Sequence, residues 1–254
     1  MSVQRLARIA VGAAVLMALL SACGGSSKKQ AAAITTVPAT TSTVATTSTT
    51  TVGDQAKAMT ELLLLTDLPA GWTSTPDSDA SDNGGLGNDG EAQLAACLGV
   101  SASRLDANPP EADSPEFTSA NQAETVDDEV EVFPTAAAAA SDFSIFDLPE
   151  TPHCLSQLFN GPFKSDITSG LEAGQTLVSL TAASRSFPAI GMHSADVEIT
   201  FVIRQSGVDI KVSVDLIVVT QGRSETQLTL TAPQTASLPQ LGPDLARVAV
   251  SRMS

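Results

Sequence analysis

Residues 197–230 read VEITFVIRQSGVDIKVSVDLIVVTQGRSETQLTL, and their pattern decides the fold. Apolar and polar side chains alternate along three segments, with the period of two that is typical of a β-strand with one buried face. The turns between the segments, 205–207 and 221–223, are short and contain glycine, so neighbouring strands must be antiparallel. The stretch therefore predicts a C-terminal β-meander with one packed face and one wet face.

The same signals upstream predict further strands and several helices. Strands are expected around Phe117 and over 125–133 and 176–182. In 125–133 valines alternate with acids, which we expect to face solvent. Helices are expected over 54–65, 91–98, 135–146, 152–159 and 243–253. Asp54 would cap the first helix and Met59 and Leu65 would lie on its buried side, whereas the last helix would cover the sheet. These elements predict an α+β fold, an antiparallel sheet packed by helices mainly on one face.

The composition excludes several classes of protein. The 254 residues are 43% apolar, too many for a wholly disordered chain, and no apolar run reaches the ~18 residues of a membrane-spanning helix. A formal net charge of −15 disfavours binding to nucleic acid. The chain has two histidines, no tyrosine and no GxSxG, P-loop, HExxH or dinucleotide motif. We therefore expect no enzyme, no catalytic residue, no cofactor and no metal.

The first 23 residues have the order of an export signal: a basic start, the apolar run 9–20, then small residues before Cys23. The junction 20–24, LSACG, resembles the bacterial lipobox, in which the cysteine receives a diacylglyceryl group and becomes the new N-terminus. We expect 1–22 to be a lipoprotein signal peptide. Cys23 would then carry two or three acyl chains, such as palmitate, and hold the protein on the outer, extracytoplasmic face of the cell membrane. The alternative is an ordinary cleaved signal with a chance cysteine.

Residues 23–53 are expected to form a disordered tether. Between Ala31 and Gly53 ten of 23 residues are threonine, and no apolar periodicity offers a face to bury. The tether is either an O-glycosylated stalk or an unmodified spacer. The exported α+β domain would then span 54–254.

Two further cysteines remain, Cys97 and Cys154. An exported protein meets an oxidising environment, so a structural disulfide between them is expected, joining the helix over 91–98 to the helix over 152–159. Two free thiols and a redox pair are the alternatives, although no CxxC spacing is present.

Short motifs follow one another in a fixed order: LLTDLPAGW at 64–72, CLGV at 97–100, VEVFP at 130–134 before an alanine-rich helix, and then Cys154. In this order they resemble exported domains of actinobacteria, namely the PknH-like extracellular sensor domains and lipoproteins of similar architecture. The resemblance covers roughly residues 58–254, and none of its motifs is catalytic. It implies an α/β ligand-sensing or binding module with a cleft and no established reaction.

Few individual side chains suggest a site. Trp72, after a proline and glycine turn, is the candidate for lining a ligand cleft, with core packing as the alternative. His153 and His193 lie too far apart for a metal or triad spacing, so we expect surface or partly packed histidines. Residues 79–91 approach a calcium-loop pattern, but Glu91 comes one residue late, so a solvated acidic loop is expected.

Three functions are compatible with these observations. The first is a non-catalytic sensor-like domain that binds an apolar or envelope-derived small molecule between sheet and helices. The second is a protein-interaction or structural module of the cell envelope, which would use the acidic region 77–131, suited to a basic partner, or the wet face of the sheet. The third is an uncharacterised hydrolase, which would need a histidine facing a serine and a carboxylate.

Overall fold

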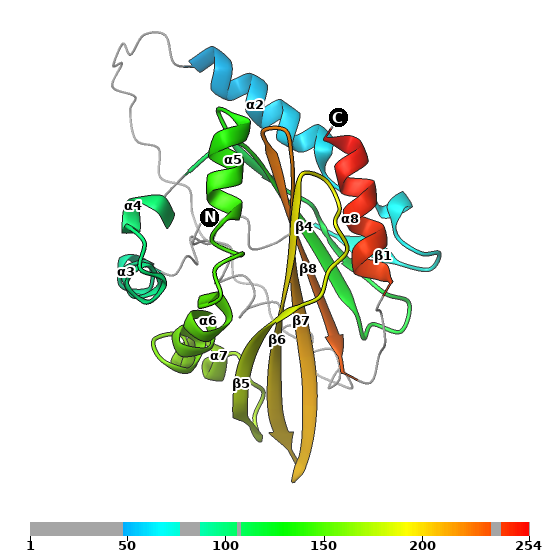
Figure 1. The fold of residues 1–254 in the computed structure, drawn as a ribbon. Helices are drawn as coiled ribbons and strands as arrows, with labels where there is room; N and C mark the ends of the chain where they lie inside the picture. The colour runs from blue at the N-terminus through cyan, green and yellow to red at the C-terminus, as the bar shows by residue number, and fades with distance from the viewer. Residues whose placement is uncertain (1–47, 77–86, 106–107, 235–239, 254) are drawn as a thin grey trace, which may run out of the picture.

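The structure, a computed structural model, describes residues 48–76, 87–105, 108–234 and 240–253 (Figure 1). Within these residues eight strands form one antiparallel sheet in the order β1-β3-β4-β8-β7-β6-β5, and β2 pairs with β4 beside this path. The strands are β1 (Thr73–Thr75), β2 (Glu111–Asp113), β3 (Glu116–Thr118), β4 (Thr125–Val132), β5 (Gln175–Arg185), β6 (His193–Gln205), β7 (Val208–Gln221) and β8 (Ser224–Pro233). The expected α+β class is confirmed.

The expected meander consists of β6, β7 and β8, and β5 adds a fourth antiparallel strand at its edge. A two-residue turn joins β6 to β7, and both of its residues, Ser206 (φ 51°) and Gly207 (φ 82°), lie in the left-handed region. This backbone geometry matches the twist of the paired strands. Glycine provides the same conformation at Gly222 (φ 61°) between β7 and β8.

The helices lie close to their expected positions. They are α2 (Ser48–Glu61), η2 (Leu65–Asp67), α3 (Gly87–Leu98), α4 (Ala102–Leu105), α5 (Ala136–Phe143), α6 (Thr151–Asn160), α7 (Lys164–Ser169) and α8 (Leu241–Arg252). Asp54 does not cap the first helix, because α2 begins six residues earlier, at Ser48. Met59 and Leu65, expected on the buried side, are 63% and 40% exposed. Within the described residues, every helix is too short or too polar to span a bilayer.

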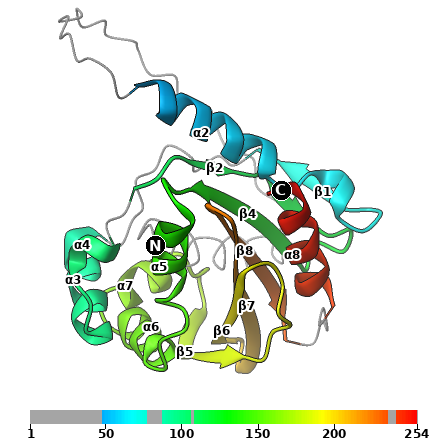
Figure 2. The same cartoon turned by 45° about the horizontal axis from the view of Figure 1, so that its top comes forward.

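Helices cover both faces of the sheet, with more of them on one side (Figures 1 and 2). Side chains such as Ile199 and Leu216 pack in one apolar cluster with α3, α5, α6 and α7. On the opposite face Ile217 and Leu228 pack beneath α8. The wet face of the meander is therefore confined to the ends of β5, β6 and β7 beyond α8, where the outward side chains remain partly exposed.

Three of the four acids of β4 do not face solvent, contrary to the expectation from the sequence. Asp128, Glu129 and Glu131 are all buried. The reason is tertiary, because β4 lies inside the sheet, with α2 packed on one face and α5 over the other. Its even-numbered side chains, including Val130, meet α2, and its odd-numbered side chains lie on the α5 side.

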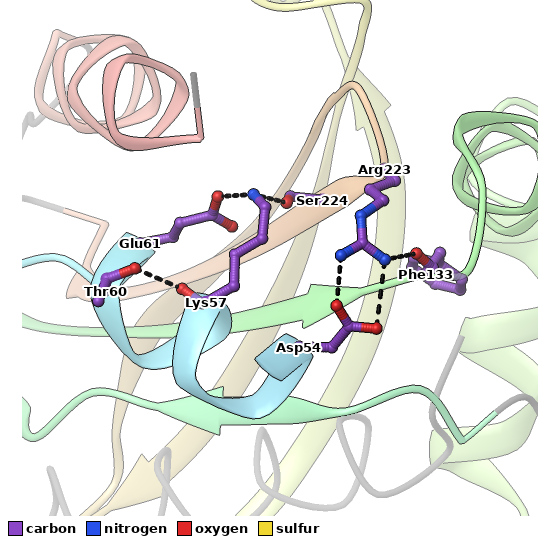
Figure 3. Close-up of polar contacts among 7 residues, drawn as sticks. All are labelled: Asp54, Lys57, Thr60, Glu61, Phe133, Arg223 and Ser224. Carbon is purple, nitrogen blue, oxygen red and sulfur yellow. Dashed lines mark hydrogen bonds and ion pairs between the residues drawn. The ribbon is translucent and has the colours of Figure 1, made fainter. Parts of the chain in front are cut away.

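Polar contacts fix α2 to the turn between β7 and β8 (Figure 3). Arg223 donates to both carboxylate oxygens of Asp54 and, at 3.1 Å, to the carbonyl oxygen of Phe133. One turn along the helix, Lys57 bonds Glu61 and donates to the hydroxyl of Ser224 at 3.0 Å. Residues far apart in the sequence thus hold the first described helix on the sheet.

The edge strand β5 is covered by α6. The side-chain amide of Asn160 donates to the carbonyl oxygen of Leu180 at 2.9 Å, and the backbone N–H of Ala182 donates to the hydroxyl of Ser156 at 2.8 Å. The position of α6 is fixed in turn by the expected disulfide to α3, which is confirmed: Cys97 and Cys154 are bonded, with their Cα atoms 5.7 Å apart.

Candidate functional site

A hollow lies beside α8, over the wet ends of β5, β6 and β7. We call it the α8 cleft; its volume is about 570 Å³, within the range of small-molecule sites. Its charged lining residues are Arg185, Asp196, Glu198, Asp215 and Arg247. Arg247 lies on α8 and donates a hydrogen bond to Asp244 of the same helix. The other four charged residues lie on the strands and form the floor of the cleft.

Strand pairing places these floor residues together. Arg185 of β5 lies opposite Asp196 of β6, and Glu198 of β6 lies opposite Asp215 of β7. Side chains of directly paired residues stand on the same face, about 5 Å apart at Cβ. The sheet therefore presents three carboxylates and one guanidinium to the same hollow.

One ion pair organises this floor. Arg185 Nη1 donates to both carboxylate oxygens of Asp215, at 2.9 and 3.0 Å, and its Nε lies 3.9 Å from Asp196 Oδ2. Within the described residues, no other basic side chain lies within ion-pair distance of Asp196 or Glu198. The floor therefore keeps a net negative charge.

Burial changes the protonation of two of these acids. Desolvation, followed by repulsion from Asp215, raises the pKa of Asp196 to about 7. Desolvation also raises the pKa of Asp215, against the opposing effect of Arg185. The charge of the cleft therefore changes near neutral pH, through Asp196.

Apolar side chains complete the walls. Phe187 precedes β6, and Ile217 and Leu230 come from the floor strands. Ser213 also lines the cleft, and within the described residues its buried hydroxyl has no hydrogen-bond partner. No histidine lines the described cleft. The arrangement is suited to binding a cation that carries an apolar group.

The structure does not bring the sequence-predicted site residues together. Cys23 and the acidic loop at 77–86 lie outside the described residues. Trp72 is partly buried against the cluster beneath α8 and lines neither described hollow. His153 bonds Gln157, and His193 stacks on Phe143 with ring centroids 5.2 Å apart at a smaller hollow of about 240 Å³.

The charged residues of the cleft were missed in the sequence. Glu198 and Asp215 were recognised only as outward positions of the meander, and Arg185 lies beyond the predicted end of its strand. A usable signal was present nonetheless: Glu198 and Asp215 stand at outward positions of two adjacent predicted strands, and the short turn between these strands places them opposite each other.

Comparison with known proteins gives little further guidance. No protein-family model matches the chain, and no curated protein matches it. Among solved structures it is similar to the extracellular domain of PknH from Mycobacterium tuberculosis, with a TM-score of 0.31 and 11% identity, over 64% of this chain and 90% of that chain. This likeness is weak, so the family expected from the sequence motifs stays a prediction.

Proposed function

We propose that the protein is a non-catalytic, extracytoplasmic binding domain, tethered to the membrane through lipid on Cys23, whose α8 cleft binds a small amine. The export signal and lipobox-like junction support the location. The observation that carries the ligand class is the floor of the cleft, where three carboxylates face one guanidinium.

The chemistry of the cleft favours a polar ligand over the apolar one expected from the sequence. A primary ammonium group would take the place of a counter-ion beside Asp196 and Glu198 and donate three hydrogen bonds. Phe187 and the apolar wall residues would contact the rest of the ligand. Because Asp196 has a pKa of about 7, binding would strengthen as pH rises through neutrality.

The alternative, a basic protein partner held by the acidic region 77–131, has less support. Four acids of that region lie inside the fold rather than on its surface: Glu124, Asp128, Glu129 and Glu131. The region 77–131 therefore exposes fewer acidic side chains to a partner than its sequence suggests.

Calorimetric titration of the full-length protein in detergent with 2-phenylethylamine tests the proposal, and 2-phenylethanol is the neutral control of equal size. At about pH 8 the amine should bind at least about tenfold more tightly than the alcohol, a preference that should shrink near pH 6. Glu198→Gln should weaken amine binding. Asp209→Asn, an exposed acid of β7 paired with Arg204, is the matched control and should not. Equal binding of amine and alcohol would refute the proposed ligand class.

A further inference from the structure

The outer side of α2 carries apolar side chains that are open to solvent. Val52, Ala56 and Met59 follow one another at helical spacing, and all three are exposed. Asp54 and Ala58 are buried on the opposite side of the helix, where Ala58 packs against β4. Figures 1 and 2 show α2 at the rim of the molecule, with one side against the sheet and the other turned away from it. The helix therefore presents an apolar stripe outward.

Two leucines just after the helix add exposed apolar surface. Leu64 and Leu65 are 51% and 40% exposed, whereas Leu63 is 1% exposed. Hydrogen bonds hold this turn in place: the backbone N–H of Leu63 donates to Asp128 at 2.8 Å, and that of Leu64 donates to Asp67 at 2.7 Å. The fold therefore fixes the two leucines at the surface. We call five residues the α2 patch: Val52, Ala56, Met59, Leu64 and Leu65.

The segment that carries the patch has no unpaired charge. Residues 52–76 include four charged side chains, and each of them forms an ion pair within the fold: Asp54 with Arg223, Lys57 with Glu61, and Asp67 with Arg252. The whole chain, by contrast, has a formal net charge of −15. An otherwise acidic protein thus presents an apolar surface without free charge at its first described helix.

The position of the patch along the chain indicates what covers it. The 24 residues 24–47 separate α2 from Cys23, and the inference rests on the lipid proposed at that cysteine. A chain of this length reaches at most about 85 Å when fully extended, so α2 stays within that distance of the lipid. Such a tether gives the patch a high effective concentration at the bilayer. A few apolar side chains, too weak to bind a membrane alone, are then sufficient to remain in contact with it.

We propose that the α2 patch rests on the surface of the membrane that holds the lipid, and that this contact sets the orientation of the domain. Val52 and Met59 would enter the interface between headgroups and acyl chains, where no free charge of α2 has to be desolvated. A second copy of the chain suits the patch less well, because a stable protein interface uses roughly 20–30 residues a side.

The test places the full-length, lipid-bearing protein in phosphatidylcholine vesicles with a nitroxide label on Ala56→Cys. The introduced thiol reacts alone, because Cys97 and Cys154 are bonded and Cys23 carries the lipid. A label that enters lipid gains access to oxygen and loses access to a water-soluble nickel chelate. The ratio of the two accessibilities should be at least about threefold higher than for a label on Val208→Cys. Val208 is 64% exposed and lies at the opposite end of β7 from the turn that α2 contacts.

A double variant, Met59→Gln with Leu64→Gln, should return the label on Ala56→Cys to water while the lipid keeps the protein on the vesicles. Both side chains are exposed, so the melting temperature in detergent should not change. Val208→Gln replaces an exposed apolar side chain outside the patch and is the matched control. It should leave the label in lipid.

Three results would overturn the proposal, and they can be told apart. Equal access of water to the labels on Ala56→Cys and Val208→Cys, on protein that stays with the vesicles, would refute the membrane contact and leave the lipid anchor in place. Spin–spin broadening of the label on Ala56→Cys would show that two copies pair through α2 instead. An intact mass without lipid on Cys23 would refute the anchor and, with it, the contact.

Discussion

Arg223 and Asp54 lie 169 positions apart in the sequence, and both terminal nitrogens of the guanidinium donate to the two oxygens of the carboxylate (Figure 3). The pair joins α2 to the turn between β7 and β8. The hydrogen bonds from Arg223 lower the pKa of Asp54, so the contact persists until the pH falls below the usual range for an aspartate.

Asp54→Asn should loosen α2 without unfolding the sheet. Loss of a charged, doubly bonded contact should increase hydrogen–deuterium exchange of the α2 amides by about tenfold, and β7 should stay protected. Asp209→Asn removes a comparable pair with Arg204 at the far end of the meander and serves as the control. Faster exchange throughout the sheet would contradict this role.

Reduction of the Cys97–Cys154 bond should destabilise the domain strongly. The bond closes a loop of 57 positions, for which the chain-entropy model gives about 4 kcal/mol. Urea unfolding with and without dithiothreitol measures the difference. A Cys97→Ser, Cys154→Ser double variant should resemble the reduced protein and show no response to dithiothreitol. Equal stability of oxidised and reduced protein would refute the structural role.

The folded protein should lose stability as pH rises from about 4 to 8. Desolvation raises the pKa of Asp127 to about 8, of Asp128 to about 6 and of Asp196 to about 7. In this window the folded state holds more protons than the unfolded state, so the free energy of unfolding falls with rising pH. Asp196→Asn should remove roughly 2 kcal/mol of this dependence. Urea unfolding in EDTA at several pH values measures it, and an unchanged slope would contradict the raised pKa.

Gly191→Ala should lower the free energy of unfolding more than an alanine substitution at another glycine with a positive φ. Gly191 has φ 68°, and an added Cβ would lie 2.6 Å from the carbonyl oxygen of Thr220, which accepts a hydrogen bond from Met192. We expect a loss of about 3 kcal/mol, against about 1 kcal/mol for Gly174→Ala, where φ is 89° and no atom lies within 4 Å of the added Cβ. Equal losses in urea unfolding would show that the close approach to Thr220 is relaxed without cost.

Local patterns were sufficient to predict the meander, the helices and the disulfide. The alternation around Phe201 depends on neighbours two residues away, and a short loop such as Ser206-Gly207 allows only one pairing of strands. Cys97 and Cys154 could be paired by count and compartment alone.

Features that depend on a second covering layer could not be predicted in this way. Glu129 and Glu131 alternate with valines just as surface acids would, and only the elements packed around β4 make them interior. Arg185, Asp196 and Asp215 share no local spacing and meet through the pairing of three strands. The cleft therefore has no local spacing pattern, although Glu198 and Asp215 can be placed together once their two strands are paired.

The cover that α6 provides for β5 has a consequence for self-assembly. An uncovered edge strand is a template on which a second molecule adds by backbone pairing, the first step of many aggregates. Ser156 and Asn160 already occupy backbone groups in the middle of that edge, and the disulfide keeps their helix in place. Unfolding of α6 would expose this edge, so we expect the less stable, reduced protein to aggregate more readily than the oxidised protein.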